Sequence, residues 1–206
     1  MAKRVARAPR SAKTPGVEFR ALTSERWPDL EALFGARGAC GGCWCMTWRL
    51  KRSDFARGKG EGNRKALRAI VTSGAEPGVL AYAGGEPVAW CAVAPREVYP
   101  ALGRSRVLAP VDERPVWSIS CLFVTRGMRR SGVSVPLIRA AVAHAAAHGA
   151  EAVEAYPVEP YSPEMPAAFA WTGIASAFRK AGFKEVLRRS RPRPIMRFET
   201  ATRRSR

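Results

Sequence analysis

The spacing of apolar residues along the chain predicts strands that alternate with helices. Short apolar runs bounded by Gly, Pro or polar residues indicate strands near residues 17–23, 79–83, 87–94, 116–124, 152–158 and 193–198. Longer segments with apolar residues three or four positions apart indicate helices over residues 25–34, 63–72, 135–148 and 169–181. The resulting order, β-αα-βββ-α-β-α-β, predicts an α/β fold with helices flanking a mixed central sheet.

One segment combines a strand, a basic turn and a helix without a break. The strand over residues 116–124 runs into Arg129, Arg130 and a short Ser-Gly-Val-Ser sequence, and a helix follows directly. The first backbone N–H groups of a helix have no partner within it, so they attract anions, and small residues let a phosphate approach the backbone. The turn therefore predicts a phosphate-binding site, with an ordinary strand-to-helix turn carrying surface arginines as the alternative.

Two motifs resemble those of one enzyme superfamily. Arg129, Gly132 and Ser134 resemble the acyl-CoA loop of the GNAT N-acetyltransferase superfamily, whose pattern is Arg or Gln, two residues, Gly, one residue, then Gly or Ala. Ser134 departs from that pattern. Lys180 to Phe183 is similar to the Lys-x-Gly-Phe turn that ends a late helix in the same superfamily. The resemblance covers most of residues 17–198 and extends to an uncharacterised branch with a CWCM-type segment, here residues 43–49.

The resemblance implies a GNAT-like, mostly antiparallel sheet in which the strands at residues 116 and 152 splay apart around the pantetheine arm of acetyl-CoA. The implied cofactor residues are Leu122, Phe123 and Val124 for the pantetheine arm and thioester, and Arg129, Arg130, Ser131, Gly132, Val133, Ser134 and Val135 for the pyrophosphate. The implied activity is transfer of an acetyl group from acetyl-CoA to a primary amine, by direct attack in a ternary complex. A catalytically inactive CoA-binding sensor or scaffold is the alternative.

Catalytic groups depart from the usual pattern of that superfamily. No carboxylate lies between residues 114 and 150, where a glutamate base is common, and Phe178, assigned to the cofactor site, replaces the usual tyrosine acid. We expect Tyr156, at the end of a strand and at the mouth of the cleft, to be the proton donor. Period-two alternation places Glu154 on the same face as a candidate base. The alternative is a satisfied hydroxyl and a solvated carboxylate.

Two serines on the central strand are further catalytic candidates. Ser118 and Ser120 share one face of a regular strand, so they could orient a water molecule. The alternative is that both hydroxyls bond locally to the backbone.

Cys40, Cys43 and Cys45 have the spacing of metal ligands, but a structural zinc site needs four ligands and no fourth is evident. We therefore expect no metal. One interpretation is that these are small buried groups around two tryptophans; another is an acyl-carrying Cys43 or Cys45. The resemblance implies instead that the segment shapes the acceptor pocket, through the residues Trp44, Cys45, Trp48 and Arg49. His144 and His148, one turn apart on a predicted helix, are expected to face solvent.

Composition limits the remaining choices. With 206 residues and 47% hydrophobic content, we expect one domain over residues 17–198 between basic tails at 1–16 and 199–206. The net charge of +18 raises the possibility of nucleic-acid binding, but no base-reading motif is present, so this function ranks last. No apolar run is long enough for a membrane span or a secretion signal, which favours the cytoplasm. The resemblance leaves a homodimer possible.

Overall fold

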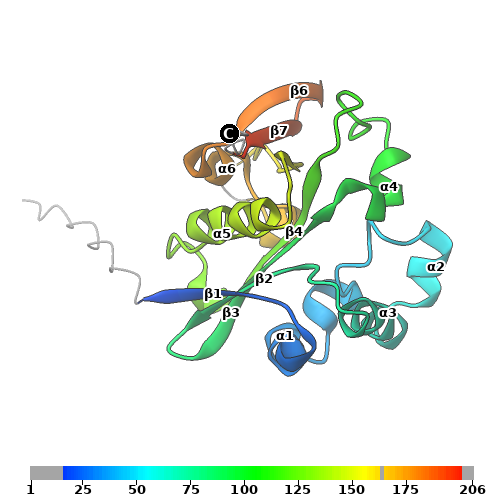
Figure 1. Cartoon of the computed structure of the whole chain (residues 1–206), viewed down its shortest axis with the longest axis vertical. Helices are drawn as coiled ribbons and strands as arrows, with labels where there is room; N and C mark the ends of the chain where they lie inside the picture. The colour runs from blue at the N-terminus through cyan, green and yellow to red at the C-terminus, as the bar shows by residue number, and fades with distance from the viewer. Residues whose placement is uncertain (1–15, 163–164, 201–206) are drawn as a thin grey trace, which may run out of the picture.

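A computed structural model describes residues 16–162 and 165–200 (Figure 1). Its strands are β1 (Val17–Ala21), β2 (Gly78–Ala83), β3 (Glu86–Pro95), β4 (Trp117–Val124), β5 (Ala152–Ala155), β6 (Lys184–Ser190) and β7 (Arg193–Glu199). Its α-helices are α1 (Trp27–Phe34), α2 (Arg52–Arg57), α3 (Glu61–Thr72), α4 (Pro100–Gly103), α5 (Ser134–Ala147) and α6 (Ala175–Ala181). The predicted tails fall largely outside the described residues, although β7 continues to Glu199.

The seven strands form one mixed sheet in the order β1-β2-β3-β4-β5-β7-β6. Only β4 and β5 pair in parallel; the other neighbours are antiparallel, as predicted. The parallel pairing joins Trp117–Ile119 to Val153–Ala155, and β4 then continues to Val124 without a partner on that side. The two central strands therefore part in the middle of the sheet.

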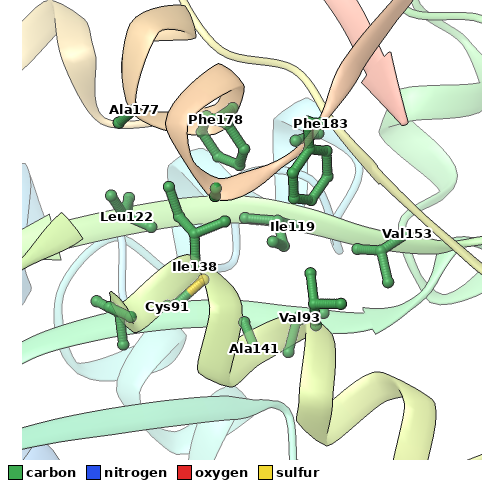
Figure 2. Packing of buried hydrophobic residues seen from close by; sticks show 14 of the residues in the cluster. Cys91, Val93, Ile119, Leu122, Ile138, Ala141, Val153, Ala177, Phe178 and Phe183 are labelled. Carbon is green, nitrogen blue, oxygen red and sulfur yellow. The ribbon is translucent and has the colours of Figure 1, made fainter. Parts of the chain in front are cut away.

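Helices cover both faces of the sheet. On one face, α5 and α6 bury a core that includes Ile119, Ile138 and Phe178 (Figure 2). On the other face, α1 and α3 pack against Leu80 and Trp90. Among the described helices, none has the length and apolarity that crossing a bilayer requires.

The connection between β3 and β4 forms a third, small core. The sequence of residues 95–114 is polar and interrupted by prolines, but Tyr99, Leu102 and Leu108 are buried there with Tyr156 and Ile195. These apolar residues are scattered among prolines and charges without a helical or strand period, so the sequence pattern does not indicate their burial.

A β-bulge interrupts the alternation of β4. Cys121 pairs with Ala92 and Ile119 with Val93, so Ser120 is the extra residue. As a result, Ile119 and Leu122 both lie in the core under α5, whereas Cys121 lies in the core on the opposite face. Strict period-two counting along this strand assigns the wrong face to everything beyond the bulge.

The predicted helix over residues 169–181 is wrong in its first half. α6 begins only at Ala175, because Gly173 adopts φ +82° and packs against the ring of Phe178. A Cβ at position 173 would lie 2.6 Å from that ring. The sequence also gave no sign of β6, whose mostly exposed residues show no alternation, or of the short polar helix α2.

The close approach of β2 to β3 at Gly78 predicts a loss of stability when a larger residue replaces this glycine. A Cβ at Gly78 would lie 2.2 Å from the carbonyl oxygen of Cys91, so Gly78→Ala must displace β2 from β3. We expect it to lower the free energy of unfolding by about 2 kcal/mol, as overpacking does. Gly62→Ala is the matched control: it lies in α3 with open space around it, so we expect stabilisation of up to ~1 kcal/mol. Urea unfolding of both variants checks this, and equal effects would contradict it.

Candidate functional site

A cavity of about 560 Å³ lies where β4 leaves β5. This volume is within the usual range of small-molecule sites, roughly 300–1,000 Å³. Its lining residues are Ala39, Cys40, Leu122, Phe123, Val124, Arg129, Arg130, Ser134, Ala170, Trp171, Gly173, Ile174 and Ala177. Six of them, Leu122, Phe123, Val124, Arg129, Arg130 and Ser134, were predicted as cofactor residues; Ala39, Cys40 and Trp171 were not, because their approach depends on loop packing.

The basic loop at the mouth of this cavity is held in a defined conformation. Arg130 and Gly132 adopt φ values of +64° and +91°, so the backbone reverses just before α5. Arg129 Nε donates to the Val124 carbonyl at 3.2 Å, and the buried side chain of Val133 anchors the loop in the core under α5. The exposed guanidinium groups thus lie beside the first turn of a 14-residue helix, an arrangement suited to an anion.

The other predicted loop residues are close to the cavity without lining it. Ser131 Oγ donates to the Met128 carbonyl at 2.7 Å, Gly132 precedes α5, and Val135 lies in its first turn.

The free edge of β4 is partly covered by the chain itself. The N–H of Leu122 donates to the carbonyl of Trp171 at 2.7 Å, so the segment before α6 takes the position of a neighbouring strand. The Trp171 ring stacks on Trp48, with centroids 5.7 Å apart. Backbone groups of successive strand residues point to opposite sides, so those of Phe123, next to Leu122, point toward β3 and away from the cavity. Leu122 and Val124, but not Phe123, therefore offer backbone groups to a ligand.

Phe178 does not line the cavity, contrary to our expectation. Its side chain is fully buried in the core and packs edge-on against Phe183, with centroids 5.2 Å apart (Figure 2). Ala177, one residue earlier on α6, faces the cavity instead.

A buried ion-pair network lies beneath the point where β4 and β5 separate. Glu154 is 1% exposed, and its Oε1 accepts hydrogen bonds from Arg197 Nε and Nη2 at 3.2 and 2.7 Å. Its Oε2 lies 3.4 Å from Arg96 Nη1. Arg197 also reaches Asp112 on the surface through two hydrogen bonds of 2.8 and 3.0 Å. The carboxylate of Glu154, the candidate base, is thus paired with two guanidinium groups instead of being exposed to solvent.

Tyr156 is the centre of the polar contacts in this network. Its hydroxyl donates to Glu154 Oε2 at 3.0 Å, lies 2.8 Å from Ser118 Oγ, and accepts a hydrogen bond from Arg96. Burial, together with the charge of Glu154, raises the pKa of this phenol well above its usual value. The phenol therefore keeps its proton at neutral pH.

Three of the four predicted catalytic residues, Ser118, Glu154 and Tyr156, are brought together, but Tyr156 is not at the mouth of the cleft. β5 ends at Ala155, and the Tyr156 side chain turns into the third core, where none of it is exposed. Ser120 is apart from this group, because its hydroxyl bonds to the Tyr99 hydroxyl.

Arg96 and Arg197 were missed by sequence reasoning. An arginine flanked by apolar residues inside the predicted last strand was a usable signal for Arg197, since a buried charge requires a partner. Nothing in the local sequence distinguishes Arg96.

A second cavity of about 360 Å³ opens on the other side of this network. Four carboxylates line it, from Glu97, Asp112, Glu113 and Glu154, against the two guanidinium groups of Arg96 and Arg114. Arg197 also pairs with Glu154 and Asp112, so the four carboxylates outnumber the arginines around them by one. In a chain with a net charge of +18, this small local excess of negative charge favours a cationic group.

The Trp/Cys segment, residues 43–49, divides into buried and accessible parts. Trp44 and Cys45 are core residues with φ values of +42° and +54°, and Trp90 Nε1 donates to Cys45 Sγ at 3.2 Å. Hydrogen bonds from the Cys121 thiol and from this indole lower the pKa of Cys45 despite its burial. Trp44 and Cys45 line neither of the two cavities described above.

Trp48 and Arg49 are only partly buried. Trp48 meets Trp171, and the Arg49 guanidinium lies over the Tyr99 ring, 4.6 Å from its centroid. These two remain the accessible members of the predicted acceptor set.

Comparisons with known proteins give a consistent result. A model of the acetyltransferase (GNAT) family matches residues 44–167. The fold is similar to a GNAT-family acetyltransferase from Streptococcus agalactiae, at 13% identity, 91% and 98% coverage of this chain and that one, and a TM-score of 0.53. It is also similar to AAC(6')-Ib in complex with ribostamycin and coenzyme A, at 19% identity, 89% and 93% coverage and a TM-score of 0.51. No curated protein matches significantly.

The buried network predicts unequal effects of neutralising its two acids. Glu154→Gln leaves Arg96 buried without its counter-charge and leaves Arg197 with Asp112 alone, so we expect the free energy of unfolding to fall by about 3–5 kcal/mol. Asp112→Asn removes the same charge from a side chain that is 45% exposed, where solvent screens the ion pair, and we expect a clearly smaller loss. Chemical denaturation of both variants makes the comparison; a smaller loss for Glu154→Gln than for Asp112→Asn would refute it.

Proposed function

This chain belongs to the GNAT acetyltransferase family, and we propose that it transfers the acetyl group of acetyl-CoA to a primary amine by direct attack in a ternary complex. The observation that carries this proposal is the cavity beside the unpaired half of β4, with two arginines and the start of α5 at its mouth. A free strand edge suits the amide groups of a pantetheine arm, and the basic mouth suits a pyrophosphate.

We propose different backbone partners for the different parts of the cofactor. Leu122 N–H and Val124 C=O face the cavity, so they are the proposed partners of the pantetheine arm. In the present structure the Leu122 N–H donates to the Trp171 carbonyl, and the Val124 carbonyl accepts from Arg129 Nε. Cofactor binding therefore exchanges the Trp171 contact for one with the pantetheine amide, and moves Arg129 toward the pyrophosphate. The exchange replaces one hydrogen bond by another, so the rearrangement costs little.

The acidic cavity is the proposed entry for the amine. An amine is mostly an ammonium ion at neutral pH, and the carboxylates of Glu97, Asp112 and Glu113 attract it. The fold is also similar to AAC(6')-Ib, whose complex contains ribostamycin with coenzyme A. Trp48 and Arg49 complete the acceptor side in this proposal.

The chemistry needs one C–N bond to form and one C–S bond to break. The neutral amine attacks the thioester carbonyl carbon, and its nitrogen then loses one proton to solvent. The tetrahedral intermediate collapses with cleavage of the C–S bond, and CoA leaves as a thiolate that takes up a proton. We propose that Tyr156 supplies this proton, because its phenol remains protonated and lies one residue beyond the last β4–β5 pair. Ser118 and Glu154 hold the hydroxyl in place, and positioning of the two substrates supplies most of the remaining acceleration.

A CoA-binding module without catalysis is the second candidate. It is favoured by the burial of Tyr156 and by the pairing of Glu154 with two arginines, which weakens both as proton-transfer groups. Cofactor binding is common to both candidates, so only turnover separates them.

Cofactor binding is tested by thermal denaturation with acetyl-CoA. At about 100 times the dissociation constant, binding stabilises the folded state by about 2.7 kcal/mol, and we expect a rise in Tm of several degrees. Arg129→Ala/Arg130→Ala should reduce the shift strongly. Lys65→Ala/Arg68→Ala removes the same charge from the exposed side of α3 and should leave the shift unchanged. A parent protein whose Tm does not respond to millimolar acetyl-CoA would rule out the cofactor site.

Catalysis is tested by mass-spectrometric detection of acetylated products from a panel of amines. We expect Tyr156→Phe to lower kcat by about 10²- to 10³-fold, the usual contribution of a positioned acid, while the Tm shift with acetyl-CoA persists. Val98→Ala, at an exposed position outside both cavities, is the control for nonspecific loss. Turnover unaffected by Tyr156→Phe would remove Tyr156 from the mechanism. Cofactor binding without any turnover in the panel would instead favour the inactive module.

A further inference from the structure

Two histidines and a glutamate converge at the C-terminal end of α5, apart from the residues that line the two cavities described above. His144 and His148 lie one helical turn apart, with ring centroids 4.4 Å from each other. Glu76, in the loop that precedes β2, reaches both of them. One ligand atom from each of the three side chains lies within 4.8 Å of the other two.

Hydrogen bonds to the backbone determine which ring nitrogens are protonated. His144 Nε2 lies 3.2 Å from the Glu76 carbonyl oxygen, and His148 Nδ1 lies 2.8 Å from the His144 carbonyl oxygen. A carbonyl oxygen only accepts hydrogen bonds, so both of these nitrogens must carry a proton. In the neutral rings, the lone pairs then belong to His144 Nδ1 and His148 Nε2.

These two lone pairs face the same carboxylate oxygen. Glu76 Oε2 is 3.8 Å from His144 Nδ1 and 3.6 Å from His148 Nε2. Both distances are too long for hydrogen bonds. They are near the separation of about 3.3 Å that ligands bound at ~2.0 Å have around a tetrahedral ion. Three acceptor atoms that face one another without a donor between them attract a cation.

The surroundings suit metal binding. Burial, reinforced by the neighbouring His148, lowers the pKa of His144 and keeps it in the neutral form that ligates metals. The backbone hydrogen bonds orient both rings, as outer contacts do at metal sites. The Trp117 ring lies 6.1 and 5.6 Å from the two imidazoles, measured between centroids, and forms an apolar wall. His148 is 44% exposed, which leaves a path for an ion.

We propose that Glu76, His144 and His148 bind a divalent first-row transition ion, with Zn²⁺ as the reference ion. Two imidazoles and one carboxylate are ligands that this class of ion accepts, and they leave a coordination position for water. The ion joins the end of α5 to the loop before β2, and so stabilises the helix whose other end forms the basic loop. The expectation that these histidines face solvent does not hold for His144, whose side chain is only 9% exposed. Sequence reasoning missed the site because Glu76 is 68 residues from His144.

The test is a Zn²⁺ titration of the full-length protein, in which binding is measured by calorimetry and by Trp fluorescence. Because Cys40 and Cys43 are also accessible to Zn²⁺, a Cys40→Ser/Cys43→Ser background is titrated in parallel. We expect one ion per chain in both backgrounds and a higher Tm with Zn²⁺. Glu76→Gln and His148→Gln should each weaken binding at least tenfold and abolish the Tm shift, whereas the exposed Glu86→Gln should change neither.

Co²⁺ provides an independent spectroscopic result. Nitrogen and oxygen ligands give visible d–d bands without the near-ultraviolet charge-transfer band of a thiolate, and we expect that pattern to disappear in His148→Gln. Three outcomes would overturn the proposal: no binding to the parent at millimolar Zn²⁺, equal affinity in Glu76→Gln and His148→Gln, or binding lost in the cysteine background. His148→Gln alters an exposed side chain, so a folded protein is expected for the comparison.

Discussion

The three-residue parallel contact between β4 and β5 is the constraint on which the rest of the structure depends. Beyond Ile119 and Ala155 the two strands are no longer paired with each other. The 560 Å³ cavity lies beside the part of β4 that has no β5 partner. The pairing ends at a buried ion pair: Glu154 accepts from Arg197 of the adjacent β7 and contacts Arg96 just after β3. A charge buried this deeply is stable only with its partners in place, so the network ties together the strands on both sides of the opening.

Charge differs in sign between the two cavities. The chain is strongly basic, and Arg129 and Arg130 present this charge beside α5, where we propose that a pyrophosphate binds. The smaller cavity is lined by four carboxylates and two arginines, and we propose it for the amine. A general excess of positive charge thus coexists with a local acidic entry, and the net charge alone would have suggested only polyanionic partners.

The two tryptophans of the Trp/Cys segment, Trp44 and Trp48, make different contacts. Trp44 stacks on Trp27 and packs against Phe34, so it holds the segment onto the α1 side of the sheet. Trp48 extends to Trp171, whose carbonyl covers the free N–H of Leu122. The proposed acceptor side and the proposed cofactor edge are therefore in contact through one pair of stacked rings, Trp48 and Trp171. A cofactor that displaces Trp171 would also move Trp48.

The sequence by itself determined the features whose signals are local. The glycine pair between β2 and β3, the apolar run of β4 and the basic turn before α5 each depend on neighbouring residues, and the structure has all three. Only the tertiary structure decided the bulge at Ser120, the burial of Tyr156 and the meeting of Glu76 with His144. A bulge follows from pairing between strands, and burial from what covers a residue. A cluster drawn from distant segments requires the folded chain, so no periodicity in the sequence could have shown it.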